Sequence, residues 1–166
     1  MTSEPADGIA VRRLTASDRA GWLAMRIALY TEADPDTRVA ELVQEIDRML
    51  ARDDWAAFGA EAPDGELVGL IELFERNVAE SCESSPVSYI EGLWVAAAWR
   101  RRGLARRLVE AARDWARSRG RTEMASDVQI ANLVSQAVHR RLGFAETERL
   151  VTYRLPIDDV AQPRAL

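Results

Sequence analysis

The chain has 166 residues, of which 48% are hydrophobic and 30% are charged, and its formal net charge is −5 at pH 7. This length suits one domain that buries its own core, and the balance of residue types is typical of a globular protein rather than a disordered one. The acidic balance argues against general nucleic-acid binding and favours a small cationic partner. We therefore expect a single domain over residues 1–166, with loose ends at 1–8 and 156–166.

The counts of cysteine and histidine and the hydropathy of the chain exclude several kinds of bond, site and segment. A single cysteine, Cys82, excludes an internal disulfide, and with only one histidine in the chain a Cys/His zinc site is not expected. No apolar run approaches the length of a membrane span, and the first residues lack the apolar core of a signal peptide. We therefore expect a cytoplasmic protein that uses no metal and does not enter a membrane.

The first half of the chain predicts strands and helices in alternation. Thr15 and Asp18 supply N-cap chemistry for the first helix, and Pro63-Asp64-Gly65 marks a tight turn. The predicted elements are a strand over 9–13, a helix with Trp22, Leu23, Ile27 and Tyr30 on its buried face, a loop over 31–36, a helix over 39–50, strands over 55–61 and 66–75, and a polar loop over 77–86.

The second half is organised around a strand over 89–95 and a long amphipathic helix that begins near Gly103 and is capped by Gly120. A short strand over 123–126, a helix capped by Asn132 and one or two strands within 144–155 follow, and Ser126 to Gln129 forms a possible capping box. The last helix carries Leu133, Ala137, Val138 and Leu142 and is closed by Gly143. This order predicts an α+β fold with a mixed, mostly antiparallel sheet.

The junction between the central strand and helix reads Arg100-Arg101-Arg102-Gly103-Leu104-Ala105. A helix start offers unpaired N–H groups, small residues let a phosphate approach the backbone, and arginines add charge-assisted hydrogen bonds. The alternative is a plain helix start behind a solvated arginine cluster. The spacing Arg-x-x-Gly-x-Ala after a strand resembles the acetyl-CoA pyrophosphate loop of the GNAT superfamily of N-acyltransferases, whose order of elements also resembles the one predicted here.

Three further blocks resemble the aminoglycoside 6′-N-acetyltransferases within that superfamily. The blocks are Cys82-x-Ser84-Ser85-Pro86-Val87 with Ile90-Glu91-Gly92, then Glu123 to Asp127, then Asn132-x-x-Ser135-Gln136-x-Val138-His139-x-x-Leu142-Gly143-Phe144-x-Glu146-Thr147-Glu148-Arg149. The resemblance implies transfer of an acetyl group from acetyl-CoA to the 6′-amine of an aminoglycoside by direct attack in a ternary complex, which confers antibiotic resistance. It also implies a homodimer, with the final strand at 151–155 paired across the interface.

The resemblance assigns roles position by position. The cofactor would be held by Leu93, Trp94, Val95, Arg101, Arg102, Gly103, Leu104, Ala105, Arg106 and Asn132. The residues that match family positions facing the aminoglycoside are Tyr30, Glu91, Asp127 and Glu148. The family carries an aromatic residue in the loop before Cys82, where this chain has Val78. Further acids that would attract a polycation are Glu32, Asp34, Glu80 and Glu83.

The proton acceptor stays open between Asp127 and Glu91. By alternation Glu91 shares a strand face with Tyr89, Leu93 and Val95, which lines either a polar cleft or a solvated surface. Asp127 is either a helix N-cap or the carboxylate that faces the amine. Because Ser126 can supply the cap instead, we favour Asp127 as the base.

His139 stands where many GNAT enzymes carry a tyrosine regarded as an acid. It is therefore a weaker candidate for reprotonating the CoA thiolate, because a histidine can serve as an acid near neutral pH. Two other functions remain open: acetylation of another amine, such as a polyamine or a protein N-terminus, and a non-catalytic acyl-CoA sensor.

Overall fold

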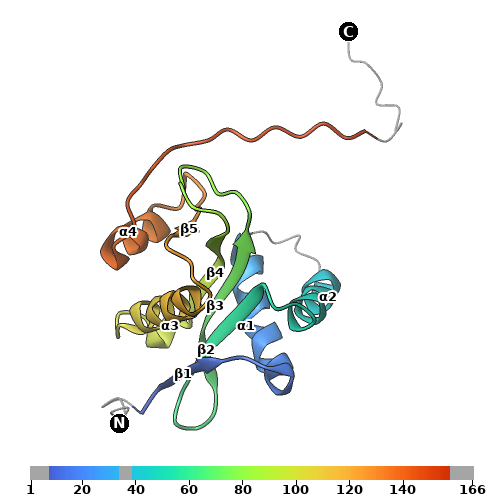
Figure 1. Ribbon diagram of the computed structural model, residues 1–166. Helices are drawn as coiled ribbons and strands as arrows, with labels where there is room; N and C mark the ends of the chain where they lie inside the picture. The colour runs from blue at the N-terminus through green and yellow to red at the C-terminus, as the bar shows by residue number, and fades with distance from the viewer. Residues whose placement is uncertain (1–7, 34–38, 158–166) are drawn as a thin grey trace.

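The computed structural model describes residues 8–33 and 39–157 (Figure 1). The expected loose ends at 1–8 and 156–166 fall almost wholly outside these residues, as do Asp34 and the side chain of Glu32. The elements are β1 (Ala10–Arg13), the 3-10 turn η1 (Ala16–Asp18), α1 (Arg19–Ala33), α2 (Val39–Leu50), β2 (Trp55–Glu61), β3 (Leu67–Arg76), β4 (Val87–Val95), the 3-10 turn η2 (Ala97–Trp99), α3 (Leu104–Ser118), β5 (Met124–Ser126) and α4 (Leu133–Leu142).

The five strands form one sheet in the order β1-β2-β3-β4-β5. Neighbours from β1 to β4 run antiparallel, and β4 and β5 run parallel with α3 as the crossover between them. This is the mixed, mostly antiparallel sheet that the order of elements predicted. The strand at the middle of the site, β4, is therefore held by β3 along one edge and by β5 along part of the other.

Helices cover both faces of the sheet (Figure 1). On one face α1 and α2 pack through Trp22, Met25, Ile46 and Met49 against Leu14, Ala57 and Leu70. On the other face α3 packs through Leu104, Leu108, Val109, Ala112 and Trp115 against apolar residues of β2, β3 and β4. Burying these side chains is the main stabilisation of the fold, at about 25 cal/mol for each Å² of apolar surface removed from water.

A β-bulge interrupts the pairing of β3 with β4. Glu72 pairs with Gly92 but Leu73 pairs with Ile90, so Glu91 is the extra residue. An extra residue reverses the alternation of all side chains beyond it. Leu93 and Val95 accordingly pack in the same cluster as Ile90, so the expectation that Glu91 shares a face with both of them is wrong.

Two sequence expectations about helices need correction. No helix begins at Asp127, so Ser126 to Gln129 is not a capping box, and α4 starts instead after its N-cap Asn132. Among the described side chains of α1 the buried ones are Trp22, Met25 and Arg26, whereas the other expected residues are only half-buried. No residue of α4 is fully buried, and its half-buried Leu142 packs against the core on the α3 face of the sheet.

The C-terminal segment after Phe144 forms no strand among the residues described, up to Ile157. It leaves the body of the molecule as an extended arm (residues 145–157, Figure 1), and its apolar side chains are largely exposed. The expectation of one or two strands within 144–155 is therefore wrong for this single chain. An alternating apolar pattern becomes a strand only beside a free strand edge, and the arm lies against none in the chain itself.

Among the described residues, no helix combines the length and the apolar character that crossing a membrane requires.

Candidate functional site

A gap opens between β4 and β5, at the side of the sheet where β5 is the last strand. β5 pairs with β4 only through Ser88, Tyr89 and Ile90. Beyond the bulge, β4 continues as Leu93 to Val95, which pair with β3 on one side and with no described strand on the other. Although the carbonyl of Val95 already accepts from Arg100 Nε, this edge pairs with no described strand, so an extended ligand chain can bind along it. This fits the expected role of Leu93, Trp94 and Val95.

The start of α3 lies directly beyond this free edge. Gly103 has a φ of 81° and Arg101 a φ of 63°, so the turn passes through two left-handed positions. The first main-chain bond of the helix runs from Arg107 N to Gly103 O at 3.2 Å, which leaves the amides from Leu104 to Arg106 without partners inside the helix. A Cβ added to Gly103 would meet no atom within 4 Å, so there is room for a phosphate at this helix start.

The three arginines before α3 are exposed, and two of them contact the chain. Arg100 Nε donates to Val95 O at 2.9 Å, and the Arg102 guanidinium lies 4.9 Å from the centre of the Trp99 ring. These contacts keep the positive charge of both side chains beside the helix start, where water and a phosphate can both reach it.

The start of α4 lies next to β5. Asn132 Oδ1 accepts a hydrogen bond from Ser135 N at 2.9 Å, as expected of an N-cap, so its amide nitrogen is the part left to contact a ligand. His139 Nδ1 lies 2.8 Å from Ser135 O and its Nε2 lies 3.0 Å from Ser126 Oγ. A carbonyl oxygen only accepts, so Nδ1 carries a proton; in the neutral ring Nε2 accepts from Ser126, and only the imidazolium has a proton to give there.

Asp127 follows β5 and is exposed, which suits a carboxylate that faces a substrate. Its Oδ1 accepts a hydrogen bond of 2.8 Å from the hydroxyl of Tyr89, a residue that is only 5% exposed. Burial and the bond to Asp127 raise the pKa of Tyr89, so its hydroxyl stays protonated and keeps donating. Among the described residues nothing pairs with the other oxygen of Asp127.

Glu91 is at the bulge and is paired with Arg76 at the end of β3. Arg76 Nε and Nη2 donate to the two oxygens of Glu91, each at 2.9 Å. The same guanidinium lies 3.5 Å from the centre of the Tyr89 ring. One chain of contacts therefore joins Glu91, Arg76, Tyr89 and Asp127, and we call these four residues the acceptor network.

Tyr30 lies beside the acceptor network but its hydroxyl is turned toward a buried acid. The hydroxyl of Tyr30 lies 3.3 Å from Glu72 Oε2. The other oxygen of Glu72, Oε1, accepts from Trp22 Nε1 at 2.6 Å and lies 3.2 Å from Arg26 Nε. Burial, together with Glu72, raises the pKa of Tyr30 to about 12. A Cβ at Gly92 would lie 3.3 Å from this hydroxyl, which places Tyr30 against the residue that follows Glu91.

The loop between β3 and β4 brings further acids to this end of the molecule. Glu148, at the root of the C-terminal arm, accepts a hydrogen bond of 2.9 Å from Ser81 Oγ. Glu80 and Glu83 of the same loop are exposed. Cys82 is half-buried, and burial with the nearby carboxylates of Glu123 and Glu80 raises the pKa of its thiol, which makes it a poor nucleophile.

Sequence reasoning missed two residues of the site, Arg76 and Tyr89. The structure brings Glu91 and Asp127 into one network through them, which no spacing in the sequence announced. A signal existed for Arg76, because it alternates with Glu72 and Phe74 on β3 and so lies on the face of Glu72. In the sequence, Tyr89 shows only the signal of an aromatic residue in a strand, which does not point to a functional role.

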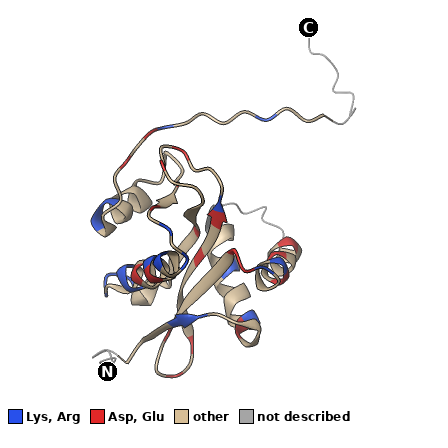
Figure 2. Cartoon of the chain, in the orientation of Figure 1, with Lys and Arg blue, Asp and Glu red and all other residues tan. Residues whose placement is uncertain are grey.

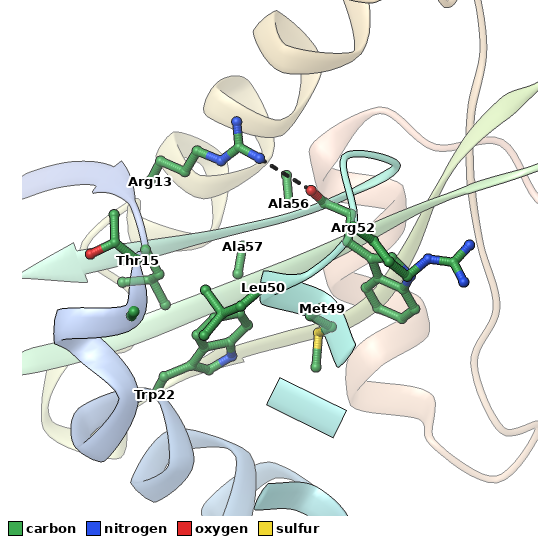
Figure 3. Close-up of a pocket in the computed structure, with 11 residues that line it drawn as sticks. Arg13, Thr15, Trp22, Met49, Leu50, Arg52, Ala56 and Ala57 are labelled. Carbon is green, nitrogen blue, oxygen red and sulfur yellow. Dashed lines mark hydrogen bonds between the residues drawn. The ribbon is translucent and has the colours of Figure 1, made fainter. Parts of the chain in front are cut away.

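A hollow of about 210 Å³ elsewhere contains none of the predicted site residues (Figure 3). Its walls come from Arg13 to Ala16, Trp22, the end of α2 and the start of β2, and Arg13 Nη2 donates across it to Trp55 O at 3.2 Å. Its volume is below that of ordinary ligand pockets. The described residues also hold no group of three or more His, Cys, Asp or Glu side chains arranged to bind a metal ion.

Comparisons with known proteins agree with this geometry. The model of the Acetyltransferase (GNAT) family matches residues 21–144. An aminoglycoside N(6′)-acetyltransferase type 1 of Serratia marcescens is 44% identical over 134 residues, which cover 80% of this chain and 89% of that protein. One of the same name from Stenotrophomonas maltophilia is 36% identical over 152 residues, 91% of this chain and 95% of that protein.

Solved structures give the same result. AAC(6′)-Iy in complex with the bisubstrate analogue CoA-S-monomethyl-acetylneamine has a TM-score of 0.83 and 34% identity, and the match covers 89% of this chain and 98% of that one. AAC(6′)-Ig from Acinetobacter haemolyticus also has a TM-score of 0.83, with 32% identity and coverage of 90% and 99%. The chain belongs to the GNAT acetyltransferase family.

Proposed function

We propose that this protein is an acetyl-CoA-dependent aminoglycoside 6′-N-acetyltransferase, an enzyme of antibiotic resistance. The observation that carries the proposal is an exposed carboxylate, Asp127, which a buried tyrosine orients beside the gap between β4 and β5. This arrangement occurs in a chain that is 44% identical to a named aminoglycoside N(6′)-acetyltransferase. An acetyl donor in the gap and an amine at Asp127 would meet at the same end of the sheet.

Acetyl-CoA would bind along the open edge of β4 and at the start of α3. The unpaired edge of Leu93 to Val95 would bind the pantetheine arm as if it were a strand. The amides from Arg101 to Arg106, with the open space above Gly103, would bind the pyrophosphate, and the amide nitrogen of Asn132 would contact the cofactor near its thiol. A metal has no role in this scheme.

The reaction follows from the two bound reactants. The amine arrives as an ammonium and must lose a proton, which Asp127 would take directly or through water. The free amine attacks the thioester carbonyl while a backbone N–H near Leu93 to Val95 stabilises the charge that develops on its oxygen. As the C–S bond breaks, the attacking nitrogen gives its extra proton to water and becomes an amide. CoA leaves as a thiolate, which needs no acid because thiols ionise readily. Positioning of the two reactants would supply most of the acceleration.

The charge around Asp127 suits a polycationic substrate. Acids of the β3–β4 loop and Glu148 gather at this end of the molecule (Figure 2). Val78, which stands where the resembling family has an aromatic residue, is 80% exposed, so this part of the loop offers a substrate a small apolar contact in place of a ring. Tyr30 would contact the substrate through its ring, because its hydroxyl is held by Glu72.

The protein would act as a homodimer in the cytoplasm. The C-terminal arm supports the dimer, since Val151, Tyr153 and Leu155 are 76%, 93% and 86% exposed, more apolar surface than a monomer usually leaves in water. Light scattering after size exclusion should give twice the chain mass, and Val151→Glu with Leu155→Glu should lower it to the mass of one chain. The free thiol of Cys82 suits a reducing compartment.

The test is release of CoA from acetyl-CoA in the presence of kanamycin, which has a 6′-amine, or paromomycin, which has a 6′-hydroxyl. Turnover of kanamycin alone would support both the reaction and its position. Turnover of both would keep the enzyme class and overturn the 6′ assignment. If neither reacts while acetyl-CoA still raises the melting temperature, the acceptor is another amine.

A further inference from the structure

The side chain of Arg76 lies where a cationic ligand of the acceptor network would be expected to bind. Its guanidinium is bound by both oxygens of Glu91 at 2.9 Å and lies 3.5 Å from the centre of the Tyr89 ring. A carboxylate and an aromatic face are the two groups with which proteins recognise an ammonium. Arg76 occupies both the carboxylate of Glu91 and the ring of Tyr89. The charge of Glu91 is therefore already balanced by Arg76 when the amine of a substrate arrives.

The same stacking acts on Asp127. Arg76 lies on the Tyr89 ring, and the Tyr89 hydroxyl donates to Asp127 Oδ1 at 2.8 Å. The ring is therefore fixed between a guanidinium and a carboxylate. Asp127 is exposed, and among the described residues only one of its oxygens has a partner. The two acids of the network thus differ: both oxygens of Glu91 are engaged, and only one oxygen of Asp127 is.

We propose that Arg76 is a positioning and specificity residue that decides which of two carboxylates receives the substrate amine: it withdraws Glu91 by ion pairing and, through Tyr89, orients Asp127. This inference rests on the proposed function, and it assigns the proton acceptor between the two acids that the sequence left open. Arg76, Glu91 and Asp127 together carry one net negative charge, which matches a single ammonium.

Three variants separate this role from a structural one. Arg76→Met keeps the length of the side chain and its packing on Tyr89 but removes the charge, so that two unpaired carboxylates compete for the amine. We expect kcat with kanamycin to fall about 10- to 100-fold, and KM to change little or to fall because the amine also binds unproductively at Glu91. Arg76→Met combined with Glu91→Gln restores the single net charge and should bring kcat back to within about tenfold of wild type. The kcat of Arg76→Lys should lie between those of Arg76→Met and the double variant.

The pH profile of kcat gives a readout that a structural role would not move. Arg76→Met removes a positive charge from the network, so the acid limb of the profile should lie at higher pH than in wild type and should return toward the wild-type position in the double variant. Three other titratable groups surround the network and are unchanged in all three variants. They are Tyr89 itself, Glu80 of the β3–β4 loop, whose charge acts on Tyr89, and His139 of α4, which contacts Ser126 next to Asp127.

The matched control is Arg119→Met. Arg119 makes a two-pronged bond to Glu75 at 2.8 and 2.9 Å and stacks on Trp115, and the acceptor network does not include it. Its turnover should stay at the wild-type value. Melting temperatures with and without acetyl-CoA should show that each variant is folded, and Arg76→Gln replaces Arg76→Met if the latter is not.

Two results would overturn the inference while wild-type turnover of kanamycin upholds the proposed function. If Arg76→Met has the same kcat with kanamycin as Arg119→Met, the Arg76–Glu91 pair is an ordinary surface ion pair. If Glu91→Gln alone, and the double variant equally, lose more than about 100-fold in kcat, Glu91 is itself the proton acceptor. Failure of the wild type to acetylate kanamycin would instead count against the proposed function.

Discussion

Two arginine–glutamate pairs begin at adjacent residues of β3 and serve different ends. Glu75 binds Arg119 and Arg121 at the C-terminal end of α3, and the exposed fraction of its side chain is 7%. Arg76 binds Glu91 beside the gap in the sheet, where the exposed fractions are 35% and 21%. Neighbouring residues of a strand point to opposite faces, so two pairs of the same chemistry lie in different environments.

The difference lies in what each pair is connected to. The bonds of Arg119 and Arg121 to Glu75 connect the end of α3 to β3, and we call this arrangement a clamp between the two elements. The Arg76 pair continues through Tyr89 to an exposed carboxylate. An ion pair becomes part of a reactive site when it constrains a group that a substrate can still reach, and remains structural when it does not.

Asp127→Asn should have a larger effect on turnover than any other substitution in the acceptor network. The amide still accepts from Tyr89 but cannot take a proton, so we expect kcat with kanamycin to fall by about 10²- to 10⁴-fold with little change in melting temperature. Steady-state kinetics over several pH values measure it. A rise in KM at constant kcat would instead mean that Asp127 only binds the ammonium.

Tyr89→Phe tests the link between the two parts of the acceptor network. Phenylalanine keeps the surface under Arg76 but removes the hydroxyl that holds Asp127 Oδ1. We expect kcat to fall about tenfold, since Asp127 remains but is less well oriented. Equal kcat in this variant and in the wild type would show that Asp127 needs no orientation by Tyr89.

Glu75→Gln tests the pair that we regard as a clamp. It leaves two arginines at the end of α3 without their carboxylate, so the free energy of unfolding should fall by about 2 kcal/mol and the melting temperature by about 4–8 °C. Turnover of kanamycin at a temperature where both forms are folded should be the same. A large loss of turnover without loss of stability would contradict the comparison.

The pH dependence of that stability has a defined sign. The hydrogen bond from Arg119, followed by that from Arg121, lowers the pKa of Glu75 from its ordinary value of 4.5. The stabilisation is therefore fully present above pH 4.5 and is lost as the pH falls through the lowered folded pKa. Melting curves of wild type and Glu75→Gln should differ at pH 6 and converge in acid; divergence on acidification would contradict this assignment.

The smallest expected effect is that of salt. Exposed acids around Asp127 attract a polycation through water, so KM for kanamycin should rise a few-fold between about 0.05 and 0.5 M NaCl. The stability difference between wild type and Glu75→Gln should change less, because that pair is mostly buried. A KM that does not respond to salt would show that short contacts rather than the surrounding charge bind the substrate.

Much of the fold was predictable because its signals are local. The strand at 55–61, the helix at 39–50, the turn before Gly65 and the caps Asn132 and Gly143 follow from residues a few positions apart, and all are present. The start of α3 behind Gly103 was predictable for the same reason. An error came where a local pattern had no partner in space: the strands expected within 144–155 lack an edge to pair with in the described chain.

From the amino-acid order alone one could name candidates for the chemistry: the small residues and arginines before α3, and the acids Glu91 and Asp127. How the surroundings of these two acids differ depends on the fold. A single extra residue at Glu91 shifts the register of β4 and turns Leu93 and Val95 to the face of α3. The pairing of Glu91 with Arg76, 15 residues away, and of Tyr89 with Asp127, 38 residues away, then depends on that register. Contacts over such separations are set by the packing of the sheet, which no local pattern encodes.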